Sequence, residues 1–346
     1  MKFIRFLLSC ILAAYVFAFP TLAQSPSPHV SAECAVLLEP ASGTVLYEKN
    51  AEETHRIAST TKLMTALVCA ESIAPDEEVT IVPEWTHVEG SSMYLRAREN
   101  YTCRELLTGL LLASGNDAAL AIAGTFPGGE AAFLTEMNAK ARSLGMENTH
   151  FSNPHGLDAP DHYSTAADLA KLMQAVLEQE ELRLLLAMPE STVHGVCYVN
   201  HNKLLRRCTG VIGGKTGYTK AAGRCLVSAC ERHGMTLVCV TLNDPDDWSD
   251  HEALYDWAFS EYTAFGISSD TVLADIPVID SVCMTRPVSV AETVHLCLPA
   301  EGRIDFFVSC APFIFASDED ETVGAAEIVC AGRPVFRCPL ICHSGN

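Results

Sequence analysis

Residues 59–70 read STTKLMTALVCA, and the interpretation of the whole chain depends most on this stretch. Its apolar residues recur at helical spacing, and neither glycine nor proline interrupts it, which predicts a helix that begins at or near Ser59. Lys62 follows three positions later, so its amine would lie on the same helical face as the serine hydroxyl. A neutral lysine amine can take the proton of such a hydroxyl. We therefore expect Ser59 to be a nucleophile and Lys62 its base.

The segments on either side of this helix predict further regular structure. Upstream, residues 35–47 alternate between apolar and polar around a turn at residues 41–43, which indicates an antiparallel hairpin. Downstream, an apolar helix over residues 106–112 is interrupted by the sequence SGN before a second helical pattern resumes. Asn116, the last residue of that interruption, would project from the break.

The second half of the α/β region consists of a helix followed by strands. Thr165 with Asp168 three positions later is a capping pattern for a long helix that runs to about Leu186. The apolar runs CLVSAC (225–230) and TLVCVTL (236–242) are typical of buried strands of one sheet. Helices followed by strands of this kind predict a mixed α/β domain.

The pattern changes near the C-terminus. From about Val272 the chain consists of short strand-like runs such as VSVAETVHLCL, RIDFFVSC and AAEIVCAG, separated by proline, glycine and acidic turns. We expect an α/β domain over residues 32–266 and a small all-β domain over residues 270–346.

The N-terminus has the features of a secretory signal. Lys2 and Arg5 precede an apolar run over residues 6–18, and Thr21-Leu22-Ala23 is a small-residue cleavage pattern. We therefore assign residues 1–23 to a signal peptide. The apolar run is too short to span a membrane comfortably, and no later stretch reaches about 18 uncharged apolar residues. The mature chain is expected to be exported to the cell envelope or secreted.

Composition limits the partners and cofactors that can be expected. The 23 basic and 43 acidic residues give a formal net charge of −20, which argues against nucleic acid as a partner because binding its phosphates requires a basic face. No Cys-x-x-Cys pair or cluster of histidines suggests a metal site, and no motif suggests a cofactor. We expect neither a metal nor a cofactor.

Fourteen of the fifteen cysteines lie after the predicted cleavage site. Several are inside apolar strand-like runs, where a free cysteine behaves as a small hydrophobic residue, so mostly reduced thiols are the favoured interpretation. Two pairs remain as candidate disulfides: Cys197 with Cys208, and Cys338 with Cys342.

Two further motifs follow the Ser-x-x-Lys motif in the chain. Ser114 of the SGN sequence offers a hydroxyl that can pass a proton between Lys62 and a departing amine, and Asn116 offers an amide for the substrate backbone. Lys215-Thr216-Gly217 should lie on a strand edge, where a cation and a hydroxyl would hold a carboxylate and the glycine would admit a peptide. Each motif alone is an ordinary turn, but their combination in this order favours acyl transfer.

The chain resembles the D-alanyl-D-alanine carboxypeptidases among the penicillin-binding proteins. Beyond the three motifs, the similarity covers YLRARENYTCRELLTGLLLASGNDAA, MNAKARSLGMENTHFSNPHGLD and KTGYTKAAG, within residues 35–259. It implies a serine β-lactamase-like fold, with an antiparallel sheet between helical layers, followed by a β-sandwich domain. It also implies that Ser59 attacks the bond between two D-alanines of a peptidoglycan stem peptide, that water frees the acyl-enzyme, and that β-lactam antibiotics acylate the same serine.

The resemblance also assigns roles to residues outside the motifs. Backbone amides of Ser59 and Tyr218 would hold the oxyanion. In the sequence NPHGLD (153–158), His155 would position either water or the loop itself, and both readings stay open.

Two departures from the family pattern limit these assignments. Some members carry an arginine after the last strand of the catalytic domain that helps to hold the substrate carboxylate, whereas here residues 243–248 read NDPDDW. Carboxylate binding would then depend on Lys215 and Thr216. Many members end in an amphipathic helix on the membrane, whereas this sequence ends in PLICHSGN, which leaves membrane association open.

Three other functions remain as alternatives. A β-lactamase requires an efficient deacylating base, usually a glutamate beside the site, and the sequence NPHGLDAPDHYS contains none. A transpeptidase differs only in using an amine instead of water as the acceptor. A catalytically inactive wall-binding module would keep the fold without turnover.

Overall fold

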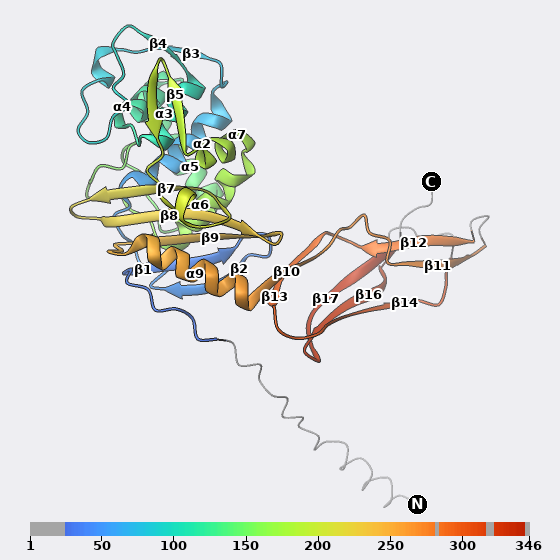
Figure 1. The fold of residues 1–346 in the computed structure, drawn as a ribbon. Helices are drawn as coiled ribbons and strands as arrows, with labels where there is room; N and C mark the ends of the chain where they lie inside the picture. Colours follow the sequence, from blue (N-terminus) through green and yellow to red (C-terminus); the bar gives the residue numbers. More distant parts are fainter. Residues whose placement is uncertain (1–24, 281–283, 316–321, 343–346) are drawn as a thin grey trace, which may run out of the picture.

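The computed structural model describes residues 25–280, 284–315 and 322–342, and the predicted signal peptide lies outside them. Figure 1 shows two units, a helix-and-sheet unit and a slender β-rich unit that extends away from it. The long helix α9 (Asp247–Glu261) leads from the first unit into the second.

Within the described residues, the first unit is built around a five-stranded antiparallel sheet. Its strand order is β2-β1-β9-β8-β7. The bounds of these strands are β1 Cys34–Glu39, β2 Thr44–Lys49, β7 Val211–Thr219, β8 Gly223–Arg232 and β9 Met235–Leu242. The predicted hairpin and the two predicted buried strands are confirmed, and the strand that carries Lys215 lies at the edge of this sheet.

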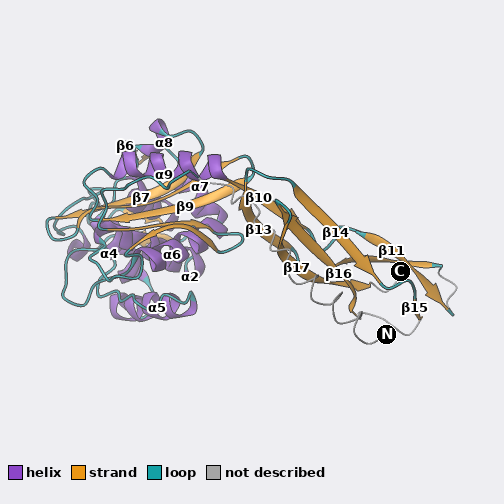
Figure 2. Ribbon diagram, turned by 90° about the horizontal axis from the view of Figure 1, so that it is seen from below, coloured by secondary structure: helices purple, strands orange, loops and turns teal. Residues whose placement is uncertain are grey.

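Helices cover both faces of the sheet, as Figure 2 shows. Successive residues of β1 alternate between two cores because side chains of a strand point to opposite faces. Val36 packs with the helices of the larger layer, while Leu37 packs with Leu254 and Tyr255 of α9. The predicted α/β class, an antiparallel sheet flanked by helices, is confirmed. The larger layer contains α2 Lys62–Ser72, α3 Cys103–Leu112, α4 Asn116–Thr125, α5 Gly129–Ser143 and α6 Ala166–Glu178.

The single long helix expected up to Leu186 is wrong. Thr165 caps α6 by accepting a hydrogen bond from the backbone of Asp168, as predicted, but the helix ends at Glu178. Gln179 is extended, and α7 (Glu180–Ala187) begins after it. Both helices contact α2, but α6 packs mainly against β1 and β9 and α7 mainly against β7 and α3. The chain therefore bends so that each helix can bury its own apolar face.

The β-rich unit contains a ribbon, β10 (Tyr262–Ile267) with β13 (Val294–Pro299), and, in the part of the chain that the structure describes, a six-stranded sheet. Ribbon and sheet share one apolar core. β10 lies inside the range expected for the first domain, yet its backbone pairs with β13, so β pairing of this unit begins at Tyr262. The strands of the sheet are β11 Ala274–Ile279, β12 Thr285–Val290, β14 Ile304–Cys310, β15 Ile314–Phe315, β16 Thr322–Cys330 and β17 Arg333–Cys342.

Short elements complete the first unit. They are η1 Ala58–Thr61, β3 Glu78–Thr80, η2 Pro83–Trp85, β4 Asn100–Thr102, β5 Glu190–Val193, β6 Val196–Val199 and α8 Leu204–Arg207. None of the helices in the described residues is both long enough and apolar enough to cross a bilayer.

The cysteines of the described residues have free thiols, and neither candidate disulfide is present. Cys338 and Cys342 lie on the same strand, β17. Four residues of a strand span about 13 Å, well beyond the reach of a disulfide. Cys197 is exposed on β6, whereas Cys208 directly follows α8 and is buried.

Candidate active site

Ser59 lies in the 3-10 turn η1 that leads directly into α2, which confirms the expected position at the start of the helix. The preceding residue, Ala58, has a φ of +46°, a conformation that costs an L-residue energy and is often found at functional sites. Gly156 packs so closely against this turn that a Cβ there would lie 1.9 Å from the Ala58 carbonyl oxygen. The close packing of Gly156 therefore restricts the conformation of the turn that carries Ser59.

Lys62 is the first residue of α2 and is fully buried. Its Nζ lies 2.8 Å from Ser59 Oγ, 2.6 Å from Asn116 Oδ1 and 2.7 Å from the backbone oxygen of His155. Burial, and then the positive charge of Lys215, hold the pKa of Lys62 well below its usual value. A neutral amine has two hydrogens and one lone pair. If the amide and carbonyl oxygens accept the two hydrogens, the lone pair is left for the serine hydroxyl.

The SGN sequence joins α3 to α4 and brings two side chains into this site. Ser114 has a φ of +58°, and Asn116 is the first residue of α4. The side-chain nitrogen of Asn116 donates to the backbone oxygen of Glu89 at 2.5 Å, while its oxygen faces Lys62. This second bond fixes the orientation of the amide, so Asn116 orients the lysine amine instead of presenting its nitrogen to the cleft.

Lys215 lies in the interior of the edge strand β7 and is 1% exposed. Its Nζ donates to Ser114 Oγ at 3.0 Å and to the backbone oxygen of Thr216 at 2.9 Å. Burial lowers the pKa of Lys215 to about 7. The two lysines thus share one polar cluster, in which each contacts a different serine.

The outer edge of β7 is next to the nucleophile. A Cβ on Gly217 would lie 2.9 Å from the backbone oxygen of Ile57 and 3.0 Å from the backbone nitrogen of Ser59, so only glycine permits this approach. Tyr218 follows and is 67% exposed. An edge strand offers backbone groups to which an extended peptide can add.

A cleft of about 420 Å³ opens beside these residues. The three sequence motifs meet there, and five of its lining residues were predicted from the sequence: Ser59, Ser114, Thr216, Gly217 and Tyr218. Five others were missed: Ser91, His201, Arg224, Asp247 and Trp248. None of the missed residues belongs to a motif, so only their positions in the fold identify them.

His155 does not occur among the described residues that line this cleft. It contacts Lys62 through its backbone oxygen, and its ring Nδ1 accepts a hydrogen bond from the backbone of Leu157 at 3.2 Å. Burial and the charge of Lys62 lower the pKa of His155 to about 4, so the ring is neutral at neutral pH. These contacts favour a role in shaping its own loop.

Asp117, which follows the SGN sequence directly, was also missed. Its buried carboxylate accepts hydrogen bonds from Ser92 Oγ at 2.6 Å and from the backbone of Met93 at 2.9 Å and of Leu95 at 3.0 Å. It therefore holds the loop that carries Ser91, one wall of the cleft. Among the described residues, no group of three or more His, Cys, Asp or Glu side chains is arranged to hold a metal ion.

A buried histidine, His162, supports the nucleophile turn. Thr61 Oγ1 donates to the backbone oxygen of Ala58 at 2.8 Å and lies 2.7 Å from Nε2 of His162. The backbone of Ser152 donates to Nδ1 of the same ring at 3.1 Å. With Nδ1 accepting, the proton of the neutral ring is on Nε2. Burial is the main cause that lowers the pKa of His162 to about 4.

Comparison with known proteins identifies relatives over most of the first unit. A family model described as D-alanyl-D-alanine carboxypeptidase matches residues 21–246. The D-alanyl-D-alanine carboxypeptidase DacF of Bacillus subtilis is 36% identical over 244 residues, which are 67% of this chain and 63% of that protein. DacB2 of Mycobacterium tuberculosis is 35% identical over 247 residues, 68% of this chain and 84% of that protein.

A solved structure extends the similarity into the β-rich unit. Penicillin binding protein 5 of Haemophilus influenzae superimposes with a TM-score of 0.82 over 93% of this chain and 99% of the other. At 24% sequence identity this likeness concerns the fold, and it includes both units.

Proposed function

Because the chain belongs to the D-alanyl-D-alanine carboxypeptidase family, we propose that it is a serine enzyme that removes the terminal D-alanine from peptidoglycan stem peptides. The observation that carries this proposal is the contact between Ser59 and Lys62, with the two other polar contacts of the amine made to Asn116 and to the backbone of His155. Such an arrangement supports a base that is ready to accept one proton from one hydroxyl.

Acylation begins when Lys62 takes the proton of Ser59. The serine oxygen then attacks the carbonyl carbon between the two terminal D-alanines, and the negative charge that develops is held by the backbone amides of Ser59 and Tyr218. The C–N bond breaks, and the proton reaches the departing amine through Ser114, which lies next to Lys215. Free D-alanine leaves and an ester on Ser59 remains.

Deacylation repeats these steps with water as the nucleophile. Lys62, neutral again, takes a proton from water, which attacks the ester, and the proton returns to Ser59 as the shortened peptide leaves. Two kinds of interaction position the substrate. Its backbone adds to the edge of β7 beside Gly217, and its terminal carboxylate faces Thr216, whose backbone oxygen accepts a hydrogen bond from the buried amine of Lys215.

A β-lactam would acylate Ser59 in the same way, because its strained amide occupies the place of the peptide bond. Activity on peptidoglycan requires the enzyme to act outside the cytoplasm, in agreement with the predicted export signal over residues 1–23.

The test is the release of free D-alanine from diacetyl-lysyl-D-alanyl-D-alanine by the mature protein. We expect release that disappears in Ser59→Ala and after treatment with penicillin. No release despite penicillin labelling would favour a transpeptidase, rapid hydrolysis of the penicillin would favour a β-lactamase, and the absence of both release and labelling would indicate an inactive module.

A further inference from the structure

We propose that Arg224 is a specificity-determining residue that binds the terminal carboxylate of the substrate, together with Thr216. This inference rests on the proposed function and adds to it a residue outside the sequence motifs. It explains how a chain with NDPDDW at residues 243–248 can recognise a carboxylate.

The position of Arg224 follows from the register of the sheet. In the antiparallel pairing of β7 with β8, Tyr218 lies opposite Arg224, and Thr216 lies opposite Leu226. Arg224 is therefore on the strand next to the substrate-binding edge, and it lines the same cleft as Ser59 and Thr216. Its side chain is 42% exposed, so the guanidinium can be reached from the cleft.

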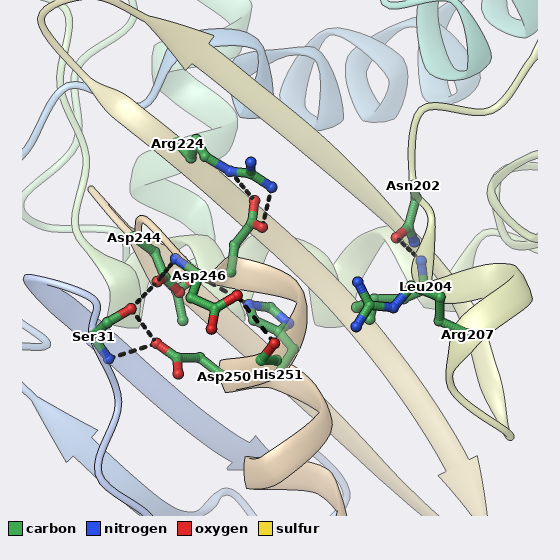
Figure 3. A network of polar contacts seen from close by, with 12 residues as sticks. Ser31, Asn202, Leu204, Arg207, Arg224, Asp244, Asp246, Asp250 and His251 are labelled. Carbon is green, nitrogen blue, oxygen red and sulfur yellow. Dashed lines mark hydrogen bonds and ion pairs between the residues drawn. The ribbon is translucent and has the colours of Figure 1, made fainter.

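The guanidinium is held in one orientation by the start of α9. Its Nε donates to Asp247 Oδ2 at 3.0 Å, and its Nη2 donates to the other carboxylate oxygen. The carboxylate is 4% exposed, and the ring of Trp248 lies 5.6 Å from the guanidinium carbon. Figure 3 shows Arg224 pointing from its strand toward the helix that carries Asp250 and His251.

This pairing leaves one side of the guanidinium open for a second carboxylate. The contact with Asp247 uses the Nε and Nη2 edge, and in the described residues the side-chain hydrogen bonds of Arg224 go to this one aspartate. A guanidinium has five hydrogens, so the Nη1 and Nη2 edge can still form a two-pronged contact with a carboxylate. Asp247 thus acts as a positioning residue for Arg224.

The charges in the cleft support the need for a second cation. Burial lowers the pKa of Lys215 to about 7, so this amine is only partly charged at neutral pH in the free enzyme. An arginine keeps its charge at every pH at which the protein is folded. Among the described residues that line the cleft, Arg224 is the one with a permanent positive charge.

The competing explanation is that the ion pair between Arg224 and Asp247 only stabilises the packing of α9 on the sheet. Another arginine of the chain has that purely structural role. Arg232, at the other end of β8, donates to Asp256 at 2.7 Å and lies 5.0 Å from the ring of Phe259, both on α9. The two arginines therefore have the same kinds of partner on the same strand and helix. Arg232, however, does not line the cleft.

The test compares two peptides that differ only in the negative charge at their C-terminus. Diacetyl-lysyl-D-alanyl-D-alanine carries the terminal carboxylate, and the same peptide ending in D-alaninamide does not. The measured quantity is the ratio of the two kcat/KM values, for the wild type, Arg224→Gln, Arg224→Lys and Arg232→Gln. A general loss of folded enzyme lowers both values and leaves the ratio unchanged.

We expect Arg224→Gln to lower the preference for the carboxylate peptide by about 10- to 100-fold, mainly through KM. Arg224→Lys should keep part of the preference, because it retains the charge without the planar fork, and Arg232→Gln should keep all of it. An unchanged ratio in Arg224→Gln would overturn the proposal.

A second measurement does not depend on peptide turnover. The rate at which penicillin acylates Ser59 is compared with the rate for its methyl ester, which lacks the carboxylate. If the protein cleaves neither peptide but still reacts with penicillin, the proposed function fails. The ratio of the acylation rates with penicillin and with its methyl ester still tests Arg224. A ratio of acylation rates that falls in Arg224→Gln, falls less in Arg224→Lys and stays at the wild-type value in Arg232→Gln supports the assignment, and equal ratios in all four proteins contradict it.

Discussion

Lys62 Nζ lies 2.8 Å from Ser59 Oγ, across the single turn that joins η1 to α2. Because the lysine is fully buried, its amine is available as a base at a pH at which an exposed lysine would be charged. This relationship connects the local structure to the chemistry, since the same turn that exposes the hydroxyl also buries the amine.

Replacement of Lys62 by methionine should lower the rate of acylation by penicillin by about 10²- to 10⁴-fold, because no base remains next to Ser59. Methionine has a similar length and leaves no buried charge, so the protein should still fold. Stopped-flow measurement of acylation checks this, with Lys171→Met as the control. Lys171 pairs with Asp168 on α6, away from the cleft, and its loss should leave the rate unchanged. Wild-type rates in Lys62→Met would contradict the assignment of the base.

Replacement of Gly217 by alanine should push β7 away from the nucleophile turn. The new Cβ would meet the backbone oxygen of Ile57 at 2.9 Å and the backbone nitrogen of Ser59 at 3.0 Å. We expect acylation to slow by about 10- to 100-fold, because small displacements of reacting groups cost that much. Gly266→Ala is the matched control, since its Cβ would meet its nearest neighbour at 3.5 Å. Equal acylation rates in the two variants would show that the close approach is unimportant.

The binding of carboxylate-ended peptides should weaken as the pH rises. The pKa of Lys215 is lowered to about 7, so its amine is charged below that pH and loses its charge above it. We expect KM for diacetyl-lysyl-D-alanyl-D-alanine to increase between pH 6 and pH 9, by up to about tenfold. The peptide that ends in D-alaninamide should show no such increase. A KM for the carboxylate peptide that falls with rising pH would mean that a group other than Lys215 supplies the positive charge.

Acid should destabilise the fold through His162. Its pKa is lowered to about 4 in the folded protein, against an ordinary value of about 6.5 in the unfolded chain. Between these values the unfolded state binds more protons, so stability that is present above pH 6.5 is lost as the pH falls toward 4, by at most about 3 kcal/mol. Urea unfolding at pH 7 and pH 4.5 measures this loss, which should be smaller in His162→Gln. An equal loss in both proteins would mean that other groups cause it.

The parts of the site that could be predicted from the sequence are those that depend on patterns of neighbouring residues. The spacing of Ser59 and Lys62, the break at Asn116 and the edge position of the Lys215 strand all follow from helical or strand periodicity within a few residues. The orientation of Asn116 could not be predicted, because its second partner is the backbone of Glu89, which has no side-chain signal.

The features that could not be predicted depend on contacts between segments that are far apart in the sequence. Arg224 lines the cleft because β7 and β8 pair in one particular register, and a shift of one residue would turn it to the other face. Asp247 and Trp248 reach the same cleft because α9 begins beside that strand. The bend at Gln179 likewise reflects which surfaces α6 and α7 cover, and not a helix-breaking residue.

The most direct test of the central claim, that Ser59 is the nucleophile and Lys62 its base, is mass spectrometry of the protein after reaction with penicillin. We expect one added penicilloyl group, located on the peptide that contains Ser59, with no such group in Ser59→Ala and very slow addition in Lys62→Met. A label on any other residue, or full labelling of Ser59→Ala, would contradict it.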